Sequence, residues 1–211
     1  LLRAVRFATR FEFEIAEETW EALEAFAPDI SRISPERTRD ELDRIWVHPN
    51  RVLGFDLLVK SGLMLAIFPE ILKLQGCEQP PQWHPEGDVF VHTRIMLDML
   101  PDEASLPLVL SVLFHDIGKP VTYSFDKLND RIRFNGHDRV GADMTESILR
   151  RLRYSNEVIE DTVVAVANHM VFKDVQKMRV AKLKRFMARH TFADELELHR
   201  VDCGSSHFSV R

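Results

Sequence analysis

Six histidine and aspartate residues of this chain have side chains of the types that can bind transition metals, at positions inside expected helices. Imidazole nitrogen together with carboxylate oxygen is the ligand set of Mn, Ni, Co, Fe and Zn, whereas Mg and Ca prefer oxygen ligands alone. Each of the six lies within or at the end of an apolar helical pattern, where an unpaired polar group is costly. The pattern therefore favours a divalent metal bound among helices. The six residues are His92, His115, Asp116, His137, His169 and Asp202.

A lone histidine in an apolar helix has a plainer explanation as a hydrogen-bonded core residue or a helix cap. No single member of the set therefore indicates a metal. The combination is more informative, because burying several imidazoles and two carboxylates costs on the order of several kcal/mol unless something pairs them. The remaining histidines lie in expected loops or polar faces and are interpreted as surface residues. They are His48, His84, His190, His199 and His207.

The segment "LFHDIGKP", residues 113–120, ends an apolar stretch with a histidine and an aspartate side by side. The stretch before it is apolar nearly all round, which indicates a central helix. Adjacent residues diverge by about 100° on a helix, so His115 and Asp116 reach one centre only near a helix end or with opposing ligands from other helices. We expect Gly118 and Pro120 to provide that helix end.

Positive side chains near the candidate ligands could hold a substrate phosphate. Lys119 lies one turn from Asp116 and is either a phosphate-binding point charge or a solvent-facing lysine at a helix end. Arg94 and Arg139, close in sequence to two of the histidines, are weaker candidates for the same role.

Length and composition indicate a globular, helical protein. The chain has 211 residues, of which 45 % are hydrophobic and 29 % charged. No apolar stretch approaches the roughly 20 residues of a membrane-spanning helix, and "LLRAVRFATR" at the start is unlike a signal peptide. Cys77 and Cys203 are too few for a disulfide framework. We expect a cytoplasmic protein with no membrane partner.

The elements that position these residues are predicted to be almost entirely helices, giving an all-α bundle. Ser34 and Pro35 mark a helix start, and Trp20, Leu23 and Phe26 recur at the spacing of one buried face. One short β-hairpin is expected, with "VTYSF" and "RIRF" on either side of "DKLND".

A change of composition divides the chain. Residues 75–88 combine prolines and glycines in a polar run, which indicates a connection between regions 1–74 and 89–211. A second feature is the basic segment 173–190, which includes Lys182, Lys184 and Arg185. This segment either attracts phosphates or is the solvated face of a helix whose apolar positions are Val180, Leu183, Phe186 and Met187.

The order His92, His115-Asp116, Asp202, with "HDIGKP" intact, resembles the HD superfamily of metal-dependent phosphohydrolases. The resemblance implies that Asp116 bridges two metals and takes part in catalysis, and that one or two ions bind. His137 and His169 look like the extra ligands of the superfamily's two-metal members. Asp202 would complete the site of His92 and His115.

The whole chain resembles the neck, body and HD region of class II CCA-adding tRNA nucleotidyltransferases and bacterial poly(A) polymerases. The residues that carry this likeness are "LLRAVRFATRFEFEI", "SPERTRDELDRI", "GLMLAIFPEI" and "FNGHDRVGA". The likeness implies RNA, in particular tRNA, as a partner, with Arg3 and Arg6 among the contacts, and leaves a homodimer open. The family's magnesium-binding nucleotidyl-transfer head has no counterpart in this chain, so we expect no nucleotide addition by it alone.

Three functions stay open at this point. The HD region could hydrolyse phosphoesters such as 2′,3′-cyclic nucleotides or RNA ends. It could instead be a non-catalytic RNA-binding scaffold with a structural metal. A free-standing HD nucleotide phosphohydrolase with a neck-like N-terminus is the third alternative.

Gly204 and the serines after it are expected to stop the last helix.

Overall fold

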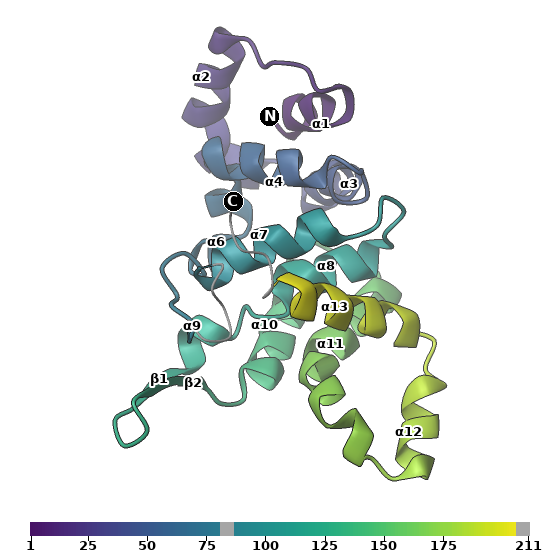
Figure 1. Cartoon of the computed structure of the whole chain (residues 1–211). Coiled ribbons are helices and arrows are strands. Elements are labelled where there is room, and N and C mark those ends of the chain that lie inside the picture. Colours follow the sequence, from purple (N-terminus) through teal and green to yellow (C-terminus); the bar gives the residue numbers. More distant parts are fainter. Residues whose placement is uncertain (81–86, 206–211) are drawn as a thin grey trace.

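A computed structural model describes residues 1–80 and 87–205 of the chain, and helices make up most of this part (Figure 1). The predicted all-α bundle is confirmed. The first half contains α1 (Leu2–Phe11), α2 (Glu17–Phe26), η1 (Ala27–Arg32), α3 (Pro35–Trp46), α4 (Arg51–Lys60), α5 (Leu63–Ile67) and α6 (Pro69–Leu72).

The second half carries every candidate metal ligand. Its elements are α7 (Val89–Met99), α8 (Leu106–Phe114), α9 (Lys119–Thr122), β1 (Tyr123–Asp126), β2 (Arg131–Phe134), α10 (His137–Arg151), α11 (Asn156–Asn168), η2 (His169–Lys177), α12 (Val180–Met187) and α13 (Phe192–Ser205). In the described part of the chain, none of these helices is long and apolar enough to span a membrane.

Short polar side chains fix where several helices begin. In each case the side-chain oxygen of the residue before the helix accepts a hydrogen bond from the backbone amide three residues later, which satisfies one of the amides that the helix leaves unpaired. Ser34 does this for α3, as predicted. In the part of the chain that the structure describes, the residues that do this are Ser34, Asp88, Ser105 and Ser155.

The predicted hairpin is confirmed as the antiparallel pair β1 and β2, in which Tyr123 lies opposite Phe134 and Asp126 opposite Arg131. The hairpin projects from the helical body (Figure 1). Its position matters because β2 leads directly into α10, whose first residue is the candidate ligand His137.

Helix α8 is the centre of the molecule, as its apolar sequence predicts. All its residues from Leu108 to Phe114 are buried, and α11 and α13 pack against it (Figure 1). This burial delivers the residues that follow, His115 and Asp116, to the interior. The fully buried Leu42, Ile45 and Trp46 of α3 belong to the same core.

Two predictions about apolar positions and helix ends are wrong. Phe26 is 56 % exposed, so of the three predicted core positions of α2 only Leu23 is fully buried. Gly204 itself does not stop α13, which continues to Ser205, the last residue described; the second serine of the predicted stop, Ser206, lies outside the described residues. A Cβ at Gly204 would lie 2.4 Å from Met99 Cε, the end of a flexible side chain on α7 that can rotate away.

Polar contacts join the region before residue 75 to the region after residue 88. The Tyr154 hydroxyl donates to Asp43 Oδ1 at 2.6 Å. Burial raises the pKa of Asp43 to about 6, although the hydrogen bond from Tyr154 opposes this shift. The hydrophobic core is continuous across both regions. The division of the chain at residues 75–88 stays a prediction.

Candidate metal centre

The structure brings all six predicted ligands together where α7, α8, α10, α11 and α13 approach one another. Helix α7 carries His92, and α13 carries Asp202. The residues His115 and Asp116 follow α8 directly. His137 begins α10, and His169 follows α11. All are buried except Asp202, which is partly exposed.

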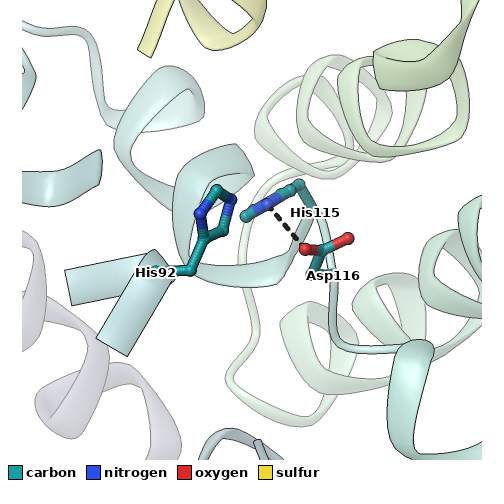
Figure 2. A group of neighbouring side chains, drawn as sticks. All are labelled: His92, His115 and Asp116. Carbon is teal, nitrogen blue, oxygen red and sulfur yellow. Dashed lines mark ion pairs between the residues drawn. The ribbon is translucent and has the colours of Figure 1, made fainter. Parts of the chain in front are cut away.

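Asp116 lies between two groups of histidines. Its Oδ2 is 3.1 Å from His115 Nε2, whereas its Oδ1 is 3.4 Å from His137 Nε2 and 3.8 Å from His169 Nε2. One carboxylate therefore faces a different group with each oxygen. Figure 2 shows the first group, in which His92 points toward the pair of residues after α8. In each group the candidate ligand atoms lie within 4.8 Å of one another.

Three of the histidines are oriented by the same local contact. Their Nδ1 atoms lie within hydrogen-bond distance of the backbone carbonyl three residues earlier. A carbonyl can only accept, so Nδ1 must donate and a neutral ring keeps its lone pair on Nε2. The contacts are His115 to Val112 at 2.9 Å, His137 to Phe134 at 2.7 Å and His169 to Val166 at 2.6 Å.

This orientation makes the inward-facing Nε2 atoms hydrogen-bond acceptors, and two of these acceptors face each other. The Nε2 atoms of His137 and His169 are 3.1 Å apart, so in the neutral rings two lone pairs meet unless a positive charge lies between them. His115 Nε2 is buried and lies 3.1 Å from Asp116 Oδ2, but among the described residues no group meets it with hydrogen-bond geometry. Histidines that donate through one nitrogen and present the other are typical metal ligands. The residues therefore fit a divalent cation.

The electrostatics favour the protonation states that metal ligands need. Burial raises the pKa of Asp116, but the neighbouring His115 and Lys119 outweigh it and hold that pKa well below its usual range. The pKa of Asp202 is also lowered, since burial, which raises it, is outweighed by the hydrogen bond with His92 together with the charges of His115 and His92. Burial lowers the pKa of His169 to about 4, because the charged ring is poorly solvated there. Ionised carboxylates and a neutral imidazole result.

The interpretation of Lys119 as a solvent-facing lysine at a helix end is wrong. Its side chain is buried, and Nζ lies 2.6 Å from Asp116 Oδ2 and 2.6 Å from the side-chain oxygen of Gln79. The ammonium also lies 5.4 Å from the centre of the Phe134 ring. A buried positive charge at the edge of the ligand cluster is suited to an anionic substrate group.

Gly118 allows the chain to turn between α8 and α10. A Cβ at this position would lie 2.3 Å from the carbonyl oxygen of His137 and 2.7 Å from the amide nitrogen of Gly141. Both neighbours are backbone atoms, which cannot rotate away. The glycine therefore lets the residues after α8 pack directly on the helix that carries His137.

We expect Gly118→Ala to destabilise the protein by about 1–3 kcal/mol, because α10 must move to admit the methyl group. The displacement of His137 should also weaken metal binding. Gly141→Ala is the matched control, since its Cβ would lie 3.4 Å or more from its neighbours. Urea unfolding and metal titration measure both effects. Equal behaviour of the two variants would contradict the close-packing role of Gly118.

The predicted RNA-contacting residues lie in two separate places. Arg3 on α1 and the three cations of α12 lie at distant ends of the molecule (Figure 1). Arg6 is buried and its Nε is 2.5 Å from Glu41 Oε2, an arrangement that holds α1 to α3 and suits a phosphate contact poorly. The predicted RNA-contacting residues that are exposed are Arg3, Lys182, Lys184 and Arg185.

The weaker phosphate candidates have different surroundings. Arg94 makes two hydrogen bonds to the carboxylate of Asp56, at 2.7 and 2.6 Å, which ties α7 to α4. Its charge is already paired. Arg139 is exposed on α10.

The histidines interpreted as surface residues differ from one another. His190 is exposed and pairs with Asp161, and His48 accepts from the Asn50 amide. His199 does not belong with them, because it is half-buried and stacks on the Phe172 ring with 4.7 Å between the ring centres. The two remaining predictions, for His84 and His207, fall outside the described residues.

Sequence reasoning missed two residues at the centre. Ser205 Oγ lies 3.1 Å from His92 Nδ1 and so orients this ring from α13. Its position three residues after Asp202 on the same helix face is a usable signal. Gln79 reaches Lys119 from the connection before α7. Nothing in the local sequence marks Gln79.

Helices that gather imidazoles and carboxylates around one buried aspartate define a helical domain whose interior could hold a metal ion. The family model described as "HD domain" matches residues 88–198, more than half of the chain, so the chain belongs to the HD domain family. The model "Probable RNA and SrmB- binding site of polymerase A" matches residues 12–74. Both matches confirm the resemblance predicted from the sequence.

Curated relatives are similar over most of this chain. The Multifunctional CCA protein of Cupriavidus metallidurans is 34 % identical over 193 residues, which cover 90 % of this chain and 46 % of that protein. The CC-adding tRNA nucleotidyltransferase of Thermus thermophilus is 35 % identical, and the A-adding tRNA nucleotidyltransferase of Deinococcus radiodurans 36 % identical; each match covers 80 % of this chain and 40 % of the relative. The chain thus spans about half the length of these relatives or less.

Proposed function

We propose that the centre is a metal-dependent phosphohydrolase site that acts on phosphoesters such as 2′,3′-cyclic nucleotides or RNA ends. One observation carries the proposal: Asp116 directs one oxygen to each of two histidine groups, as a carboxylate shared by two cations would. The proposed ligands are His92, His115 and Asp202 for one ion and His137 and His169 for the other, with Asp116 shared.

Bound divalent ions would lower the pKa of a coordinated water and offset the charge of the attacked phosphoryl group. The residues of the chain supply the setting for that chemistry. The backbone carbonyls behind the rings fix each imidazole with Nε2 inward. Lys119 places a positive charge where an anionic phosphoryl oxygen would bind, and the ion pair with Asp116 holds the lysine side chain in position.

Metal stoichiometry is the direct test. The stripped protein, reconstituted with manganese or nickel, should retain two ions per chain in elemental analysis and then hydrolyse 2′,3′-cyclic AMP. Transition metals rather than Mg are expected because imidazoles dominate the ligand set. A protein that retains no ion, or that retains two ions and hydrolyses none of the phosphoesters named above, would contradict the proposal.

The relatives support RNA as the setting for this activity. Those described above include proteins named for adding nucleotides to tRNA. We propose that the chain belongs to a larger tRNA nucleotidyltransferase of this kind and that tRNA is its partner. The centre would then hydrolyse 2′,3′-cyclic phosphates to phosphomonoesters or remove terminal phosphates at RNA ends, in contrast to a free-standing nucleotide hydrolase.

RNA holding is the second candidate function, and the match of residues 12–74 to an RNA-binding model favours it. Exposed cations on α12 would add phosphate contacts. We expect weaker salt dependence of tRNA binding when Lys182, Lys184 and Arg185 are all changed to glutamine. The slope of the logarithm of the binding constant against the logarithm of the salt concentration should become less steep by roughly 2–3, about one per lost phosphate contact. A filter-binding series over salt concentration measures it.

A matched control for this change is Lys177→Gln, in the same basic segment. Lys177 is already paired with Asp174 at 2.9 Å, so its loss should leave the salt dependence nearly unchanged. If the triple variant binds tRNA with the same slope as the unmodified protein, α12 is a solvated face and nothing more.

A further inference from the structure

We propose that Gln79 is a substrate-binding residue whose side-chain amide donates a hydrogen bond to a phosphoryl oxygen at the metal centre. The inference rests on the proposed hydrolase function and names a group that recognises the substrate there. Gln79 lies in the connection before α7, far in sequence from the residues it contacts.

The contacts of Gln79 connect it to the centre. Its side chain is 4 % exposed, and its Oε1 accepts a hydrogen bond of 2.6 Å from Lys119 Nζ. The same ammonium lies 2.6 Å from Asp116 Oδ2. Gln79, Lys119 and Asp116 therefore form one connected polar chain that ends at the shared ligand.

Lys119 fixes which way the amide faces. An ammonium can only donate, so the amide oxygen must face it and the amide nitrogen must face elsewhere. Within residues 1–80 and 87–205, Gln79 Nε2 is buried and has no hydrogen-bond partner. A buried unpaired donor is costly, which indicates that a bound group outside the protein completes it.

The chemistry beside this donor indicates an anionic acceptor. Lys119 has three protons, of which Asp116 and Gln79 take two, so a third stays free to share. An ammonium and an amide donor side by side match two oxygens of one phosphoryl group. A neutral hydroxyl would satisfy the amide but would not use the ammonium.

Space for the rest of a nucleotide adjoins this pair. A surface depression of about 360 Å³ is lined by chain neighbours of Gln79 and Lys119, among other residues. These neighbours are Cys77, Glu78 and Pro120.

The test measures equilibrium binding of inorganic phosphate to the zinc-loaded protein by calorimetry. Gln79→Glu keeps an oxygen for Lys119 but removes the donor, and Gln79→Met removes both groups without adding charge. We expect unchanged zinc stoichiometry, phosphate affinity at least roughly 10-fold lower in Gln79→Met, and a larger loss in Gln79→Glu from charge repulsion. Gln75→Met is the control, because Gln75 lines the same depression, is exposed and should bind phosphate normally.

A second measurement does not depend on the variants folding. In the unmodified zinc-loaded protein, the side-chain amide resonance of Gln79 should shift when phosphate is added. Unchanged phosphate affinity in both variants, or an unmoved Gln79 resonance at saturating phosphate, would overturn the inference and leave the hydrolase proposal standing. Failure of the unmodified protein to retain manganese, nickel or zinc would instead overturn the hydrolase proposal.

Discussion

Asp116→Asn is expected to reduce bound metal from two ions per chain to one or none and to lower hydrolysis of 2′,3′-cyclic AMP at least roughly 1,000-fold, on the order of 4 kcal/mol. The proposed role of Asp116 is to serve both histidine groups, one with each oxygen. An amide keeps the shape of the side chain but cannot give a negative charge to two cations. Elemental analysis and a phosphodiesterase assay measure the two losses.

Asp138→Asn is the matched control for this prediction. Asp138 follows His137, so the chain repeats the histidine–aspartate order there, but Asp138 is outside both ligand groups. The control should keep its metal and its activity. If Asp116→Asn retains two ions and full activity, the carboxylate is not a shared ligand and the histidines have another role.

Metal removal separates folding from catalysis in this variant. In the protein without metal, Asp116 pairs with Lys119, and its loss leaves a buried ammonium with one partner fewer. Unfolding of metal-free samples therefore reports the contribution of this pair. Unfolding with metal present adds the contribution of the bound ions, because ligands that bind only the folded state stabilise it.

The burial and secondary structure of residues that lie close in sequence to a strong local pattern could be predicted. The apolar run of α8 indicates burial whatever the tertiary contacts are, so the interior position of His115 followed from it. Ser34 and Pro35 act within one turn of their helix and were equally readable. The same is true of the hairpin, whose strands are neighbours in the chain.

Residues whose partners lie far along the chain could not be predicted. Gln79 meets Lys119 forty residues later, and Arg6 meets Glu41 thirty-five residues later. The sequence around each is polar and unremarkable, and only packing decides its partner. An apolar spacing is also no proof of burial: on α12, Val180 and Met187 are exposed and only Phe186 is fully buried, because few other elements cover this helix.

Arg51 is the largest such omission, because an arginine in "RVLGFDLLVK" gives no sign that it is 1 % exposed. Its guanidinium donates to the carbonyls of Trp46 at 3.0 Å, Pro101 at 3.2 Å and Asp102 at 2.9 Å. These carbonyls lie just after α7 and at the end of α3. One side chain therefore joins the region before residue 75 to the helix that carries His92.

We expect Arg51→Met to lower the free energy of unfolding by about 3–5 kcal/mol, because several buried carbonyls lose their donor at once. Arg51→Lys should recover only part of this loss, since an ammonium cannot reach all the carbonyls that the planar guanidinium spans. Urea unfolding of the metal-free protein measures both values.

Arg44→Met tests whether any arginine of this region would behave alike. Arg44 is exposed near the end of α3, and its loss should change the unfolding free energy by less than about 0.5 kcal/mol. A loss of similar size in both variants would show that charge alone, and not the carbonyl contacts, makes Arg51 important. A loss in Arg51→Met alone would show that the carbonyl contacts of this buried side chain, beside the Arg94–Asp56 pair, hold the region before residue 75 to the end of α7 and so help to position His92.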